Sequence, residues 1–475
     1  MTSECQAKSV VCYAEWAQGV PEEWGRSTSS MFPNSKLTTR AFPVVLLVVL
    51  AGLGQTATVG QAPQSKDPAS QQRPPASPGP SPALEWPYRV FYLGYENGLK
   101  RDRITFPEVA GYQVLKGEFH IHTLYSDAQV TPEVRVYEAW RDGLDVLAIT
   151  DHPEYLKTAF PDDRERAYER VKQLAAQLDL LLIHSVEVTT ASTSSASLRP
   201  ARNSDYTAHF ITDEAPLSGD YPSVFNSVSE QQRGLLVWAH PHTDWVPEAR
   251  ELLKSGRLDG IEVKNTQVGN RLGTQFSLGT WFYPQAVDWC LKNNLAVFAV
   301  SDAHWPIDLL VDRSKGERRP MTLLLATRRD PQGVYEAIKQ RRTLAYFNEM
   351  VWASEPWLKA LAEAALHLRA VAAADRSEFA MRYLSVENRT SIPLEVQFSL
   401  DESDGSISFN AGLSSLPGTL SRTMKLGGDS TTLVPLTLRK TRDSNKPLEI
   451  QLTVTNFRSG VDRPLRLRKV AKLVD

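Results

Sequence analysis

The sequence predicts an α/β domain whose parallel sheet closes as a barrel, followed by a small all-β domain. From about residue 88 to 366, short apolar runs alternate with amphipathic helical stretches. This alternation is typical of a parallel sheet, and the number of units favours a barrel. After about residue 374, strand-like runs follow one another, separated by turns such as Asp404-Gly405. A region of about a hundred residues is the usual size of a β-sandwich module.

The expected elements follow this alternation. Thr131 caps a helix that has Pro132 at its first position and Gly143 beyond its end. Further helices are expected at residues 164–178, 248–253, 284–292 and 331–341, and strands at 117–123, 145–150, 180–189, 234–239, 260–264 and 296–300. In the second region, strands are expected at 378–388, 394–400, 419–426, 430–439 and 448–456. We place the barrel at residues 86–368 and the sandwich-like domain at 375–475.

The first 62 residues are expected to carry an export signal. Lys36 and Arg40 precede an apolar run at 41–54, and small and polar residues follow through Ala62, which is the pattern of a secretory signal peptide. The run is too short to span a bilayer comfortably as a permanent helix. We therefore expect an exported protein, periplasmic or extracellular, without a stable membrane span once the signal is cleaved.

Two further expectations concern the true start of the chain and the segment that follows the export signal. Met31 is the expected true start, so residues 1–30 would come from an over-extended reading frame. An uncleaved N-terminal anchor is the alternative. Residues 63–85 are rich in Pro, Ser and Gln, a composition that buries too little apolar surface to fold and is typical of a linker.

The charge balance gives no reason to expect a nucleic-acid-binding protein, and the cysteine content excludes a disulfide-stabilised one. The chain of 475 residues carries 53 basic and 55 acidic side chains, so there is no electrostatic reason to expect nucleic acid as the main partner. Cys5 and Cys12 lie in the segment expected to be removed, which leaves Cys290 alone and rules out an internal disulfide. Cys290 itself is expected to be a small buried hydrophobe on a helix.

The chemistry-bearing residues begin with His120-Ile121-His122, whose alternation on a strand puts both imidazoles on one face. Further histidines and carboxylates follow, nearly all at or just past the carboxyl ends of predicted strands, where barrel active sites are built. The nine candidate metal ligands are His120, His122, Asp127, His152, Glu187, His209, His240, Asp302 and His304.

This set of side chains predicts a metal-dependent hydrolase. Histidine with carboxylate suits zinc, manganese or iron, and the lack of cysteine argues against a structural zinc. Nine ligands exceed the needs of one ion, and bridging carboxylates can hold ions about 3.5–4 Å apart. The barrel region contains neither a G-x-S-x-G motif nor a P-loop. Asp151 is expected outside the ligand sphere, where it orients an imidazole or closes a turn.

These motifs, in this order, resemble the polymerase-and-histidinol-phosphatase (PHP) superfamily. The stretches that match are Gly117-Glu-Phe-His-Ile-His-Thr-Leu-Tyr-Ser-Asp127, Gly143-Leu-Asp-Val-Leu-Ala-Ile-Thr-Asp-His152, Glu187, His209, Ala239-His-Pro241 and Ser301-Asp-Ala-His304. The resemblance implies a distorted seven-stranded (β/α)7 barrel with two or three divalent ions and a metal-bound hydroxide that attacks phosphorus.

The resemblance also implies an assignment of ligands. His120, His122, Glu187 and Asp302 would hold one ion. Glu187 would bridge to a second ion, held also by His209 and His240. A third would be held by Asp127, His152 and His304.

Softer motifs are similar to the exported PHP phosphodiesterases of the organophosphate-diester (Sb-PDE-like) group. They are Phe106-Pro-Glu-Val-Ala-Gly-Tyr112, Val136-Tyr-Glu-Ala-Trp140, Gly260-Ile-Glu-Val-Lys-Asn265 and Arg319-Pro-Met-Thr322. The chain departs from that group at Ala208-His-Phe-Ile211, where Gly-His-Phe-Asn is usual, and at Ala128, where glycine is usual. These departures bear on substrate preference and leave the predicted ligands in place.

Three functions are compatible with these residues. The favoured one is a phosphodiesterase acting on a small phosphate ester. The alternatives are a phosphomonoesterase of the nucleotide or histidinol phosphatase type and a non-catalytic exported binding module. The intact ligand set argues against the binding module, and the export signal argues against a biosynthetic phosphatase. Arg271, Arg313 and Arg319 are candidates for a phosphate contact, although a surface arginine is the default interpretation of each.

Overall fold

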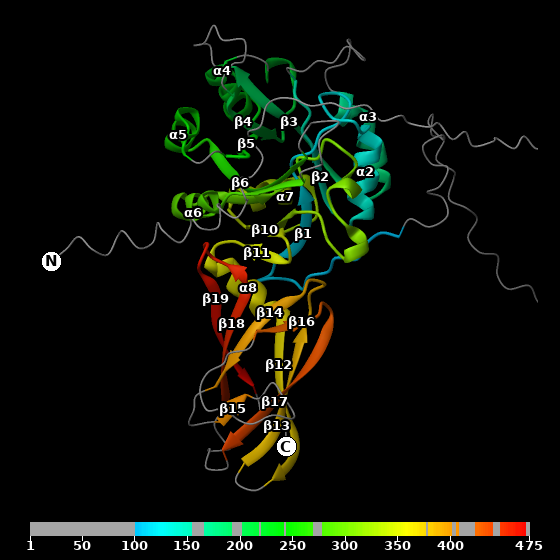
Figure 1. The fold of residues 1–475 in the computed structure, drawn as a ribbon. Helices are drawn as coiled ribbons and strands as arrows, with labels where there is room; N and C mark the ends of the chain where they lie inside the picture. The colour runs from blue at the N-terminus through cyan, green and yellow to red at the C-terminus, as the bar shows by residue number, and fades with distance from the viewer. Residues whose placement is uncertain are drawn as a thin grey trace, which may run out of the picture. The chain divides into compact units, whose positions relative to one another are not determined.

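The structure, a computed structural model, describes ten stretches of the chain (Figure 1). They are residues 100–153, 166–191, 202–217, 220–241, 244–268, 278–376, 379–400, 405–407, 423–439 and 447–471. All of them belong to one compact unit, Trp86–Asp475. The predicted export signal and linker lie outside the described residues, as does Arg271. None of the described helices has both the length and the apolar character needed to cross a bilayer.

The first part of the chain forms a mixed α/β domain in which most neighbouring strands run parallel. Strand β1 pairs with β2, β2 with β3, β5 with β6 and β6 with β8, all in parallel. The bounds are β1 Gln113–Glu118, β2 Val146–Ile149, β3 Leu181–Ala191, β5 Leu235–Ala239, β6 Leu258–Val268 and β8 Ala296–Ala299. The predicted α/β class is therefore confirmed.

Two strands run against this parallel order. β4 (Arg202–His209) is antiparallel to both β3 and β5, and β7 (Leu278–Phe282) is antiparallel to β6. No helix connects β3 to β4 among the described residues, so this step is not a βαβ unit. The finer prediction of a (β/α)7 barrel stays a prediction.

The chain beyond β1 meets the chain beyond β8. Ile121 and Ala303 form a parallel bridge, and Asp302 N donates to His120 O over 2.8 Å. The predicted strand at 117–123 is wrong in its second half, because β1 ends at Glu118 and only the bridge at Ile121 follows. The residues that bear the first histidines therefore lie where the two chain segments come together.

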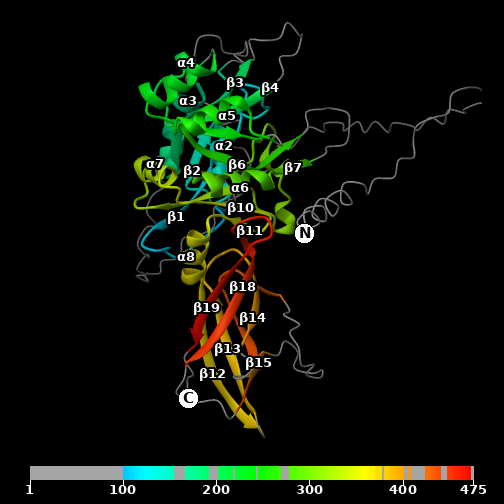
Figure 2. The ribbon, with the colours of Figure 1, turned by 90° about the vertical axis from the view of Figure 1, so that its left-hand side faces the viewer.

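The helices of the domain begin where the sequence places proline. Each carries proline in its first turn except α3, and proline suits this position because its N–H is not needed there. The helices are α2 Pro132–Arg141, α3 Arg166–Gln177, α4 Tyr221–Asn226, α5 Pro247–Lys254, α6 Pro284–Asn293, α7 Pro331–Lys339 and α8 Glu355–Ala365. Helices α2 and α3 lie side by side (Figures 1 and 2).

Three strands that the sequence analysis did not predict extend the sheet on the other side of β1. β9 (Met321–Ala326) is antiparallel to β1, β10 (Thr343–Phe347) to β9, and β11 (Met350–Trp352) to β10. Strand β11 then pairs in parallel with β18 of the C-terminal part, through Val351 opposite Phe457. The C-terminal strands thus continue the sheet of the α/β domain.

The C-terminal part consists of strands in two sheets, which agrees with the predicted all-β domain. One sheet has the order β12-β13-β17-β15, and the other strands join the large sheet through β18. The strands are β12 Leu366–Arg376, β13 Phe379–Asn388, β14 Leu394–Ser399, β15 Gly405–Ile407, β16 Met424–Leu426, β17 Ser430–Arg439, β18 Leu448–Arg458 and β19 Pro464–Ala471. Along β18, buried side chains alternate with exposed ones, as expected for a strand with one face in a core.

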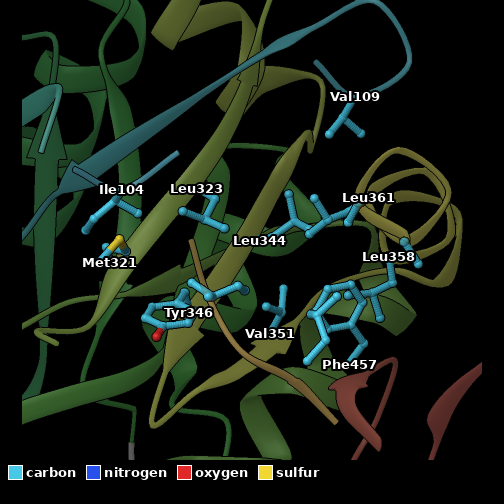
Figure 3. Close-up of a cluster of buried hydrophobic side chains, with 14 of the residues drawn as sticks. Ile104, Val109, Met321, Leu323, Leu344, Tyr346, Val351, Leu358, Leu361 and Phe457 are labelled. Atoms are coloured by element: carbon cyan, nitrogen blue, oxygen red, sulfur yellow. The ribbon is translucent and has the colours of Figure 1, made fainter. Parts of the chain in front are cut away.

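One apolar core lies where α8, β10, β11 and β18 meet. Figure 3 shows Leu344, Val351, Leu358 and Leu361 in this cluster with Phe457 of β18, and all five side chains are at most 1% exposed. Burial of such side chains is the main favourable term in folding. The strand β18 is therefore held by apolar packing as well as by its backbone pairing.

Candidate metal centre

Four buried side chains converge just beyond the ends of β1 and β8. The Nε2 atoms of His120 and His122 are 3.0 Å apart. Glu187 Oε2 lies 3.0 Å from His120 Nε2 and 3.1 Å from His122 Nε2. Asp302 Oδ1 lies 3.3 Å and 3.1 Å from the same two nitrogens. These residues, the first group, bring together four of the predicted ligands.

A second group lies on the other side of His122. It contains His122, Asp127 and His304, with Asp127 Oδ2 3.3 Å from His304 Nε2. His304 Nδ1 donates to the backbone oxygen of Asp302 over 2.9 Å, which leaves Nε2 free to accept. His152 lies beside this group, its ring stacked on His122 at 4.8 Å and its Nε2 3.1 Å from Glu187 Oε2.

A third group forms around the other oxygen of Glu187. Its members are Glu187, Asp205 and His240. His240 Nε2 lies 3.0 Å from Glu187 Oε1 and 3.4 Å from Asp205 Oδ2. Glu187 therefore directs Oε2 to the first group and Oε1 to the third, which is the arrangement of a bridging carboxylate. Asp205 was not among the predicted ligands.

The chemistry of the first group fits a divalent metal ion. Ligand atoms at about 2.1 Å from an ion and at right angles to one another are about 3.0 Å apart, close to the spacing found here. Asp302 Oδ1 is buried and accepts no hydrogen bond, although it lies 3.1 Å from His122 Nε2. Buried carboxylate oxygens normally have partners. Nitrogen and oxygen donors placed in this way suit zinc, manganese or iron.

A carboxylate outside the three groups, Glu262, orients the imidazole of His120. His120 Nδ1 donates to Glu262 Oε1 over 2.5 Å, which turns Nε2 toward the first group. Glu262 Oε2 accepts from the backbone N of His240 at 2.8 Å and from Asn265 Nδ2 at 3.0 Å. Asn265 Nδ2 also reaches Asp302 Oδ2 at 3.1 Å. Glu262 was not among the predicted site residues, although a charged residue inside the apolar run 260–264 was the available signal.

Asp151 lies outside the three groups and closes the turn that follows His122. Its Oδ1 accepts from Thr123 N and from Ser126 Oγ, each over 2.6 Å. Ser126 Oγ is in turn 3.4 Å from His122 Nδ1. Asp151 therefore acts on the backbone that carries His122 and reaches the imidazole only through Ser126.

His209 is the predicted ligand that the structure keeps apart from the three groups. It is the last residue of β4, and its Nδ1 lies 2.9 Å from Ser185 Oγ. Its Nε2 is buried without a hydrogen-bond partner, and its ring lies 5.5 Å from Phe119 and 6.3 Å from Phe298. A role of His209 as a ligand stays a prediction.

Two of the three arginines considered for phosphate binding, Arg319 and Arg313, are engaged elsewhere. Arg319 is 2% exposed, and its Nη2 donates to Glu118 Oε2 over 2.6 Å, so the surface interpretation is wrong. Glu118 Oε1 accepts three backbone N–H groups, from Phe119, His120 and Ser301. Arg313 donates to Asp142 and Asp102 at 2.5 and 3.0 Å. The Glu118–Arg319 pair thus fixes the backbone on both sides of the first group.

Burial lowers and nearby carboxylates raise the pKa of the histidines in and around the centre, so their shifts run in opposite directions. Burial alone lowers the pKa of His122, but Asp302 and Glu187 outweigh it and raise the pKa to about 10. Burial also lowers the pKa of His240, but Glu187 and Asp205 outweigh it and raise the pKa to about 9. For His209, burial and the nearby His120 lower the pKa to about 3. The anionic centre therefore favours positive charge, as protons or as metal ions, beside His122 and His240 and not at His209.

Comparison with known proteins agrees with this geometry. No protein-family profile matches the chain, and no curated protein matches it. A solved two-domain protein from Bacteroides vulgatus, which contains a predicted PHP-like metal-dependent phosphoesterase, is 31% identical. That similarity covers 78% of this chain and 99% of the other, with a TM-score of 0.64.

Two more distant structures match a smaller part. An amidohydrolase from Chromobacterium violaceum with bound sulfate and no metal is 14% identical over 40% of this chain and 88% of its own, with a TM-score of 0.29. A candidate metal-dependent phosphoesterase from Bifidobacterium adolescentis is 15% identical over 40% of this chain and 87% of its own, with a TM-score of 0.26. On the similarity to the Bacteroides vulgatus protein, and with the three ligand groups in place, the chain belongs to the PHP-like metal-dependent phosphoesterases.

Proposed function

We propose that this protein is an exported phosphodiesterase of the Sb-PDE-like kind that uses two or three divalent ions, Mn, Zn or Fe, to hydrolyse a small phosphate diester. The observation that carries the proposal is Glu187, whose two oxygens face two different groups of ligands. A carboxylate shared in this way is the usual means of holding two ions close together. When bound, the ions lower the pKa of water and offset the charge that develops on the phosphate.

The residues of the chain supply the positions of these ions. His120 is oriented by Glu262, and His304 by the backbone oxygen of Asp302, so their free nitrogens point into the centre. The backbone of His120 and of Ser301 is fixed by Glu118. Because these side chains are held in place before the substrate binds, little free energy is lost to reorganisation of the site when a charged substrate arrives.

The charge balance of the centre supports a diester over a monoester. A phosphate diester carries one negative charge near neutral pH and a monoester carries about two. The phosphate oxygens of a monoester are therefore commonly held by arginine as well as by metal. Arg319 and Arg313, two of the three arginines considered for this role, are already paired with carboxylates. The basic, apolar and small-residue pattern at 36–62 supports export, which places the substrate outside the cytosol.

The test compares a diester with its own monoester. Purified protein loaded with Mn²⁺ is assayed on bis(p-nitrophenyl) phosphate and on p-nitrophenyl phosphate. We expect kcat/KM to be at least about 10-fold higher for the diester, a difference of about 1.4 kcal/mol in the barrier. Chelation should abolish turnover and added metal should restore it. Turnover of the monoester alone would show a phosphomonoesterase instead, and turnover of neither ester by metal-loaded protein would contradict both.

A further inference from the structure

Strand β4 runs in the opposite direction to its neighbours, and this decides which of its residues reaches the metal centre. Its register places Asp205 opposite Thr189 of β3 and Ala239 of β5. His209 lies opposite Ser185 and Leu235. Ala239 is the last residue of β5 and directly precedes His240, whereas Leu235 is its first residue. Asp205 is therefore at the His240 end of β4, and His209 is at the far end.

Asp205 and His209 face the same side of the sheet, so they differ only in their position along β4. Asp205, Thr207 and His209 alternate along β4, and Thr207 lies opposite Glu187. Four residues along a strand span about 13 Å, so Asp205 and His209 cannot lie at the same level of the site. The side-chain positions agree with this register, because Asp205 Oδ2 is 3.4 Å from His240 Nε2.

His209 occupies an environment that suits a neutral core residue. It is fully buried, its Nδ1 is bonded to Ser185 Oγ, and its ring packs with Phe119 and Phe298. The latter two belong to an apolar cluster with Leu235 and Val237. Among the described residues, His209 belongs to none of the three ligand groups, whereas Asp205 shares one with Glu187 and His240.

We propose that Asp205, and not His209, is the ligand that β4 contributes to the ion bridged by Glu187. The inference rests on the proposed function, because it assumes more than one bound ion. The third group then offers two carboxylates and one imidazole, while the first offers two imidazoles and two carboxylates. A site richer in oxygen favours Mn²⁺ relative to Zn²⁺. Because it has three protein ligands and the other ion has four, the ion at Asp205 is the more weakly held of the two. Its oxygen-rich ligands also make it the more selective for manganese.

Counting bound manganese in two variants tests this assignment. Asp205→Asn removes the anionic oxygen donor with little change of shape. His209→Asn removes Nε2 and keeps a polar atom near the place of Nδ1, so that the contact with Ser185 is preserved. Each protein is stripped with chelator, titrated with Mn²⁺, and its free ion is measured by electron paramagnetic resonance and its bound ion by elemental analysis.

Asp205→Asn should lose one equivalent, or bind it at least about 10-fold more weakly, while His209→Asn keeps the wild-type number. Loss in His209→Asn with retention in Asp205→Asn would overturn the proposal, and so would retention in both. A wild-type count below two would remove its premise and the multinuclear part of the proposed function together. Loss of one equivalent in Asp205→Asn alone, together with no diesterase activity in the metal-loaded wild type, would leave the assignment of Asp205 correct and the proposed function wrong.

A third variant separates a ligand from a residue needed for folding. Asp205→His replaces one donor atom by another, and it should restore the lost equivalent with a shift of preference toward Zn²⁺. If Asp205 served only as an ion-pair partner of His240, the histidine would place two imidazoles side by side and restore nothing. Melting temperatures of all three variants show whether a loss of metal reflects a loss of fold, and a folded Asp205→His protein without the restored equivalent also contradicts the proposal.

Discussion

The α/β domain and the C-terminal strands bury side chains of different character. The α/β domain holds His120, His122, Glu187 and Asp302 at 1% exposure or less. In the described residues from Leu366 onward, the buried polar side chains are Asn388, Thr390, Asn456 and Ser459, none of which carries a charge. Because burying charge is costly unless partners compensate it, the first region retains a cluster that weakens its own core. Among the described residues, buried charge is therefore confined to the α/β domain, although apolar packing runs through both regions.

The largest expected effect is the loss of turnover when the bridging carboxylate is neutralised. Glu187→Gln keeps the size of the side chain and removes the charge that faces both ligand groups. We expect kcat to fall about 10³-fold, equivalent to about 4 kcal/mol of barrier, with an unchanged melting temperature. Glu449→Gln at an exposed position of β18 is the control and should keep full activity. More than a tenth of the wild-type kcat in Glu187→Gln would remove Glu187 from the mechanism.

The next effect should appear only in stability. Leu452 of β18 is 1% exposed in the C-terminal core. Leu452→Ala should lower the free energy of unfolding by about 2–5 kcal/mol through lost transfer energy and a cavity. The kcat of the folded protein should not change. Leu433→Ala, at a position 57% exposed, should stay within about 0.5 kcal/mol of wild type. A fall in kcat with Leu452→Ala under conditions where it is fully folded would show that the two regions are not separate in function.

The smallest effect is expected at the residue that orients a ligand without binding the ion. Glu262→Gln weakens the hydrogen bond that turns His120 toward the centre. We expect metal affinity to fall about 10–100-fold while the number of bound ions at saturation stays the same. Competition with a metal-indicator dye measures the affinity. A loss of one whole equivalent would instead make Glu262 a ligand.

The centre was predictable where ligands follow strands of the parallel sheet. His120, His122 and Asp302 were assigned from their places at strand ends, and the structure brings them together with Glu187. Asp205 could not be found in this way, because the direction of β4 depends on pairing with β3 and β5 and leaves no periodicity of its own in the sequence. The strand that carries Glu262 was predicted at 260–264, but its role was not, because the contact with His120 joins residues 142 positions apart and only the fold brings them together.

The fold was predictable where periodicity and end signals agree. Helix α2 lies where Thr131, Pro132 and Gly143 predict it, and Gly143 has the positive φ of 79° that favours glycine after a helix. Strand β12 was missed because Leu366–Arg376 is rich in alanine, which favours a helix. Pairing with β13 along most of the strand outweighs a local preference of a few tenths of a kcal/mol per residue.

The pairing of β11 with β18 has a consequence for how the protein avoids self-association. Strand β11 is short, and Val351 and Trp352 are at most 3% exposed because β18 and the core around Phe457 cover it. An uncovered strand with apolar side chains offers free N–H and C=O groups to any other chain and is a template for aggregation. The C-terminal strands thus serve as a built-in cover for a sheet edge. A catalytic domain cut free of them would keep its ligands and lose its solubility.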